Sequence, residues 1–171
     1  CSAFLSDYVD DLLRNALKEI SESDADAKLD KFVVMFRFLC DKDVFENHYK
    51  TALSKRLLSG KSVSDDLEKS MIGKMKTECG ATYVTSLEGM FTDMQLSKDV
   101  VQGFKDSAEA ERLPASMKME MNILTAGFWP IPSTDSCVLP FPATECVSVF
   151  DSYYHRKFEG RKLVWVTHQG N

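Results

Sequence analysis

The sequence predicts a mainly α-helical protein, in which a helical bundle is followed by a small, incomplete α+β module. Apolar residues recur at helical spacing through residues 1–106, and short polar or glycine-containing breaks separate the runs. After a polar, proline-containing stretch at 107–116, apolar and polar residues alternate one by one, which is the period of a half-buried strand. We therefore expect a bundle at 1–106, a linker at 107–116, and a partial module of strand, loop, helix and strand at 117–171.

The first two helical runs of the bundle differ in character. Residues 4–16 carry one apolar stripe, which predicts an amphipathic helix. Residues 29–40 are apolar on nearly every side, because Val34, Met35 and Phe38 lie opposite the main stripe. Such a pattern is typical of a helix at the centre of a bundle.

Turn and capping residues set the later boundaries. The third run ends at Gly60, a good C-terminal cap, and the residues 62–66 that follow combine capping hydroxyls with acids that suit a helix N-terminus. Gly80 ends the fourth run. The fifth begins near Tyr83, and we expect a break in it at Leu96–Ser97 before a short continuation to Phe104.

The C-terminal module is predicted from alternation and β-branched content. Methionines 117, 119 and 121 alternate with polar residues, and the strand continues through Ile123 to Trp129 before a proline-bounded loop. A short helix then ends at Gly160. The segment 162–167 is rich in aromatic and β-branched residues, which favours a second strand.

Composition excludes several classes of protein. The net charge of −5 argues against a nucleic-acid-binding protein, and no apolar run is long enough to cross a membrane. Five widely spaced cysteines without a C-x-x-C pair do not form a disulfide framework, so we expect a reducing compartment with Cys40 and Cys79 in the core. The opening residues show no secretory signal, and a start at Cys1 indicates a piece of a longer protein.

The sequence contains no convincing catalytic, metal or cofactor motif. Gly60-Lys61-Ser62 lacks the glycine five residues earlier that a phosphate-binding loop needs, so it is predicted to be a turn. The three histidines, His48, His155 and His168, lack metal-ligand spacing. The acidic pair Asp10–Asp11 is expected to face solvent. We predict a protein with no catalytic residue, no metal and no cofactor.

Three stretches of sequence resemble the C-terminal cullin homology region. Residues 41–99 read DKDVFENHYKTALSKRLLSGKSVSDDLEKSMIGKMKTECGATYVTSLEGMFTDMQLSKD, residues 122–130 read NILTAGFWP, and residues 160–166 read GRKLVWV. The resemblance covers essentially the whole chain. It implies the four-helix bundle and the beginning of the α/β module of a cullin, the scaffold subunit of multisubunit ubiquitin ligases that acts in the cytoplasm and nucleus.

The resemblance also implies partners and residues that contact them. A RING-box protein would add a strand to the sheet of the module, and the candidate edge residues are Ile123, Thr125, Trp129, Leu163, Val164, Trp165 and Val166. A ubiquitin-conjugating enzyme would be positioned indirectly, and its acidic tail would meet Arg14 and Lys18. The regions that hold the substrate adaptor, and the lysine that accepts the ubiquitin-like modifier NEDD8, are not represented in this chain.

Two alternatives to a ligase scaffold remain at this point. One is a free-standing helical adaptor that binds a partner helix in a groove. The other is a cysteine-dependent enzyme that uses Cys40, Cys79 or Cys146. The sequence gives none of these thiols a setting that lowers its pKa.

Overall fold

A computed structural model describes residues 1–16, 20–62, 64–113, 119–131 and 138–166, and it confirms the mainly helical prediction. The chain divides into two compact units, which are described separately. Unit 1 comprises Cys1–Met94 and Leu124–Pro130, and unit 2 comprises Gln95–Ile123 and Ile131–Asn171.

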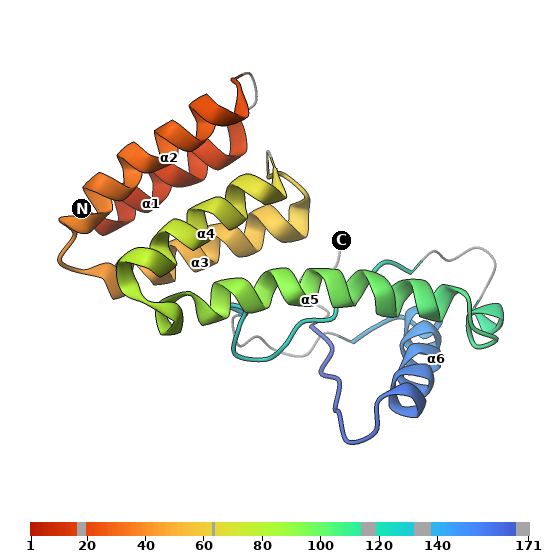
Figure 1. Cartoon of the computed structure of the whole chain (residues 1–171). Coiled ribbons are helices and arrows are strands. Elements are labelled where there is room, and N and C mark those ends of the chain that lie inside the picture. The colour runs from red at the N-terminus through yellow and green to blue at the C-terminus, as the bar shows by residue number, and fades with distance from the viewer. Residues whose placement is uncertain (17–19, 63, 114–118, 132–137, 167–171) are drawn as a thin grey trace. The chain divides into compact units, whose positions relative to one another are not determined.

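Unit 1 is built from two antiparallel helix pairs and the first part of a long fifth helix (Figure 1). Helix α1 packs on α3, and α2 packs on α4. The elements are α1 (Ser2–Asp11), a short π-helix that continues it (Leu12–Ala16), α2 (Glu22–Arg37), α3 (Lys42–Ser59), α4 (Asp65–Cys79) and α5 (Ala81–Lys105).

Capping residues mark several of the helix boundaries. The hydroxyl of Ser21 accepts the Asp24 N–H at 3.2 Å, and that of Ser64 accepts the Asp66 N–H at 3.2 Å. Gly60 ends α3 in the left-handed conformation at φ +62°, which confirms that the Gly60-Lys61-Ser62 string begins as a helix-ending turn.

The core of unit 1 contains a cluster of aromatic side chains from α2 and α3. The ring centroids of Phe36 and Phe45 are 5.1 Å apart, those of Phe32 and Phe45 are 5.7 Å apart, and Phe45 stacks on Tyr49 at 5.7 Å. All four side chains are fully buried. Truncating one of these buried rings would therefore leave a large cavity in the core of unit 1.

The prediction of a fully surrounded second helix is wrong. Val34, Met35 and Phe38 are exposed, Phe38 to 82%, because α2 packs through one face and none of the described residues covers the other. Cys40 follows the end of α2 and is exposed as well, while Cys79 is only half-buried. The apolar residues opposite the main stripe therefore lie on the surface, and α2 is not at the centre of the bundle.

A buried ionic network joins α1, α3 and α4. The fully buried guanidinium of Arg56 donates from Nε and Nη2 to the two carboxylate oxygens of Glu68, at 2.6 and 2.9 Å, and from Nη1 to Asp10. Glu68 also accepts hydrogen bonds from Tyr49 Oη at 3.3 Å and Ser62 Oγ at 2.8 Å. Every oxygen of Glu68 is therefore saturated by donors. Asp10, expected to face solvent, instead holds α1 to α3.

Burial and neighbouring charges perturb two groups of this network. Burial by itself would lower the pKa of Arg56, but the hydrogen bonds and charge of Glu68 and the contact with Asp10 raise it above its ordinary value. Burial raises the pKa of Tyr49 well above its ordinary value, and the nearby Glu68 carboxylate adds to that rise. Arg56 is therefore charged and Tyr49 neutral at any physiological pH.

A second polar cluster links α2 to α4 at the surface of the unit. Asp26 accepts hydrogen bonds from Ser70 Oγ at 2.7 Å and from Lys74 Nζ at 3.0 Å. The bond from Ser70 and then that from Lys74 hold the pKa of the Asp26 carboxyl below its ordinary value. Lys74 is also paired with Asp30 at 2.5 Å. The cluster fixes the register between the two helices from outside the core.

Unit 2 has its own apolar core around the last part of α5 and helix α6 (Phe141–Lys157), with a short 3₁₀-helix at Ala110–Arg112. The ring of Phe104 lies edge-on to Phe150 at 5.0 Å and to Tyr153 at 5.2 Å. The predicted break at Leu96–Ser97 is wrong, since α5 runs unbroken to Lys105.

Neither predicted strand forms among the described residues. Residues 119–125 and 161–166 lack secondary structure, and residues 126–128 form a turn. A strand needs a neighbour with which to exchange main-chain hydrogen bonds, and the described residues offer none to either segment. The α+β part of the prediction thus appears here as two non-helical segments and one helix, and Met117 and Thr167 lie outside the described residues.

Candidate partner-binding segments

Residues 124–130 are fastened to α5 by one buried carboxylate. Asp93 accepts the Thr125 N–H, the Thr125 Oγ1–H and the Trp129 Nε1–H, each at 2.7 Å. Trp129 is only 5% exposed and belongs to the core of unit 1. The hydrogen bonds and the buried indole together hold this segment against the helix.

Close packing around the turn reinforces this attachment. Gly127 adopts φ +93°, and its carbonyl accepts a hydrogen bond from Lys50 Nζ on α3 at 3.2 Å. A Cβ added at Gly89 of α5 would lie 2.5 Å from the ring of Phe128. The ring therefore needs a glycine beneath it, and the segment cannot shift along α5 without losing this fit.

Residues 161–166 in unit 2 are held by side chains and not by main-chain hydrogen bonds. Leu163 and Trp165 pack against the core of the unit, and Trp165 Nε1 donates to Asp151 Oδ1 on α6 at 3.0 Å. Val164 points away and is 85% exposed. No hydrogen bond joins the main chain of residues 161–166 to another described residue. The segment is thus anchored by alternate side chains while its backbone donors and acceptors stay open.

The structure separates the seven candidate edge residues into two groups. Thr125 and Trp129 are tied to Asp93, and the Ile123 N–H donates to the hydroxyl of Ser97 at 2.7 Å within unit 2. The other four, Leu163, Val164, Trp165 and Val166, form the segment with open backbone groups. Binding of a partner at any of them stays a prediction, but only the second group has an unpaired edge.

The proposed docking patch for an acidic tail is partly internal. Arg14 Nε donates to Asp10 Oδ2 at 2.7 Å, and Asp10 also binds Arg56. Asn15 donates to Asp11. Lys18 lies outside the described residues. The positive charge of Arg14 is therefore already compensated by a carboxylate, which weakens its attraction for an acidic partner.

The Cys79 thiol sits in an environment that disfavours the thiolate. Burial raises the pKa of the Cys79 thiol, and Glu78 beside it adds to that effect. Cys40 is exposed at the end of α2, and no group of three or more potential metal ligands gathers anywhere in the described part of the chain. The surroundings of Cys79 therefore do not favour its use as a nucleophile.

Sequence reasoning missed Asp93, the residue that organises the first segment. Its signal was present, because Asp93 and Ser97 fall at helical spacing from Met90 on the buried face of α5. A polar side chain on a buried face must find a partner, and here each of the two holds a main-chain N–H of the following segment.

Comparison with known families agrees with this arrangement of a helical region and a distinct following module. A family model described as the cullin alpha solenoid domain matches residues 1–101, and one described as the cullin alpha+beta domain matches residues 123–171. The chain belongs to the cullin family. Its cullin alpha solenoid match includes the whole helical part of unit 1, and its alpha+beta match begins at the segment that Asp93 and Ser97 hold.

Curated relatives match nearly the whole chain. It is 44% identical to Cullin-3 of Dictyostelium discoideum, 47% identical to Cullin-3B of Arabidopsis thaliana and 44% identical to Cullin-4A of Mus musculus, each over 98% of its length. The chain spans 22% of the length of each of these relatives. Within the described residues, none of the helices combines the length and apolarity that a membrane crossing requires.

Proposed function

We propose that this chain is the part of a cullin-RING ubiquitin ligase scaffold that binds a RING-box protein, and that it performs no chemistry itself. The proposal rests on one observation: the main chain of residues 161–166, which includes the exposed Val164, forms no hydrogen bond with another described residue. Cullin family membership supports a ubiquitin ligase scaffold in general terms. More specifically, the chain binds a RING-box protein, which in turn positions a ubiquitin-conjugating enzyme.

The mode of binding follows from the anchoring of the segment. Leu163 and Trp165 are held by the core of unit 2, so the backbone between them is anchored on both sides. An incoming strand would then pair with the unbonded N–H and C=O groups, a mode of recognition in which main-chain hydrogen bonds supply the affinity. Preorganisation lowers the ordering cost of binding. Binding in this way requires only a correctly placed backbone and no chemically reactive side chain.

A pair of substitutions at one position tests this mode. Val164→Pro removes a main-chain donor and restricts the preceding residue, whereas Val164→Thr keeps the backbone donor and the β-branched shape. The affinity of the proline variant for a purified RING-box protein should fall by at least about tenfold. Proline removes a main-chain hydrogen-bond donor and also disturbs the backbone conformation that strand pairing needs. The threonine variant should bind as the parent does.

The opposite pattern would refute the proposal. If the proline variant bound the RING-box protein as tightly as the parent, the backbone of residues 161–166 would not be the docking element. Circular dichroism and the fluorescence of Trp165, which packs beside the mutated site, would show that each variant keeps the unit 2 fold.

A further inference from the structure

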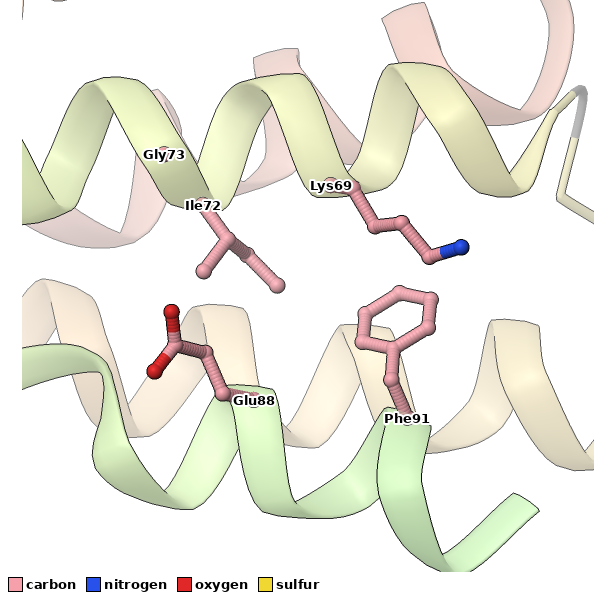
Figure 2. Close-up of a pocket in the computed structure, with 5 residues that line it drawn as sticks. All are labelled: Lys69, Ile72, Gly73, Glu88 and Phe91. Carbon is pink, nitrogen blue, oxygen red and sulfur yellow. The ribbon is translucent and has the colours of Figure 1, made fainter. Parts of the chain in front are cut away.

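A hollow of about 290 Å³ opens between α4 and α5 on unit 1. It is lined by Lys69, Ile72, Gly73, Glu88 and Phe91 (Figure 2). Side chains from the two helices reach toward each other across it, and the ammonium group of Lys69 lies near the edge of the Phe91 ring. Ile72 is buried and Phe91 half-buried, so the floor of the hollow is apolar.

A glycine keeps one wall of the hollow open. Gly73 lies inside α4 with an ordinary negative φ, and a Cβ placed there would meet no atom within 4 Å. The backbone therefore does not require glycine at this position, and glycine in a helix interior is destabilising relative to alanine. What glycine provides here is space beside Ile72.

The charges around the hollow are unequal. Glu88 is paired with Lys76 Nζ at 2.9 Å, so its carboxylate is already compensated. Lys69 is exposed and forms no ion pair with a described residue, although Asp65 and Asp66 precede it by one turn of the same helix. The hollow therefore offers a ligand an apolar floor and one lysine that forms no ion pair with a described residue.

We propose that this hollow is a docking site for a short segment of a partner protein in which a leucine or phenylalanine adjoins an acidic residue. The apolar side chain enters between Ile72 and Phe91, where it removes exposed apolar surface from water. The neighbouring carboxylate pairs with Lys69. A basic segment is disfavoured because Lys76 already pairs with Glu88, the carboxylate that the described lining residues supply. The inference goes beyond RING-box binding, since it concerns α4 and α5 of unit 1.

Nuclear magnetic resonance can test the site with a defined probe. The ¹⁵N-labelled chain is titrated with the capped peptide Gly-Ser-Leu-Asp-Leu-Glu-Ser-Gly, and a matched peptide carries Asn and Gln in place of Asp and Glu. We expect saturable shifts confined to amides near residues 69–73 and 88–91. Lys69→Gln should raise the dissociation constant by about fivefold, the scale of one exposed ion pair.

Two variants separate docking from general attraction. Gly73→Leu fills the hollow without removing charge and should abolish the saturable shifts, yet its melting temperature should equal or exceed that of the parent because leucine favours a helix. Lys31→Gln removes the same charge from α2, outside the hollow, and should bind the peptide as the parent does.

The following results would overturn the proposal. If the amide shifts did not saturate up to about 5 mM peptide, the hollow would not bind this peptide with useful affinity. If Lys69→Gln and Lys31→Gln weakened peptide binding equally, the binding would come from nonspecific electrostatic attraction. Unchanged binding by a folded Gly73→Leu variant would place the peptide elsewhere.

Discussion

The buried Arg56–Glu68 pair offers the sharpest test of what holds unit 1 together. In Glu68→Gln, one carboxylate oxygen becomes an NH₂ group, and in either orientation this group faces both an Arg56 donor and a hydroxyl, that of Ser62 at Oε1 or that of Tyr49 at Oε2. Removing one partner of a buried ion pair typically costs about 3–5 kcal/mol. Asp10 still compensates Arg56 from a site that is 23% exposed. We therefore expect the free energy of unfolding to fall by about 3 kcal/mol.

Urea unfolding followed by tryptophan fluorescence measures this loss for unit 1 alone. The chain has two tryptophans, one in each unit, so a Trp165→Phe background leaves Trp129 as the reporter. Glu78→Gln is the matched control, because it breaks the ion pair with the largely exposed Arg37 and should lower the free energy of unfolding far less. A loss for Glu68→Gln no larger than for Glu78→Gln would show that the buried network does not stabilise the fold.

Other predictions concern the core, the thiols and the pH dependence. Phe36→Ala should lower the unfolding free energy by about 3–5 kcal/mol in the same urea assay, and an unchanged midpoint would place the ring outside the core. Iodoacetamide should label exposed Cys40 faster than Cys79, whose thiol pKa is raised by burial, as followed by peptide mass spectrometry; equal rates would contradict this. The pKa of Asp26 lies below its ordinary value of 3.8 in the folded state, so the stabilising effect of its charge is full well above that value and is lost as the pH falls through the lower folded pKa. Asp26→Asn should therefore destabilise the chain at about pH 7, and urea unfolding at a series of pH values should show that the destabilisation shrinks progressively below pH 3.8.

Local signals predicted the helices well because each acts within a few residues. Gly60 and Ser64 mark boundaries through their own backbone conformation and hydroxyl groups, and both appear where the sequence places them. The exposed face of α2 could not be predicted in the same way. Whether Val34 and Phe38 are covered depends on which helices pack beside them, and the residues themselves do not encode that.

The candidate segments show the same division between local and long-range information. Aromatic and β-branched content predicted a strand at residues 162–167, but that content does not specify a neighbouring strand, and residues 161–166 lack secondary structure. Leu163 and Trp165 pack against the core of unit 2 while Val164 is exposed. The role of Asp93 depends on a contact with Trp129, 36 residues away, and no periodic pattern within α5 specifies that partner.

Hydrogen exchange of the main-chain amides at residues 162–166 tests the central claim most directly. In the chain alone, these amides should exchange fast, because their backbone has no hydrogen-bond partner among the described residues. Addition of a RING-box protein should slow alternate amides of this segment, as an added strand requires, and leave those of α2 unchanged. Binding that left exchange at residues 162–166 unaltered would contradict the assignment of this segment as the docking edge.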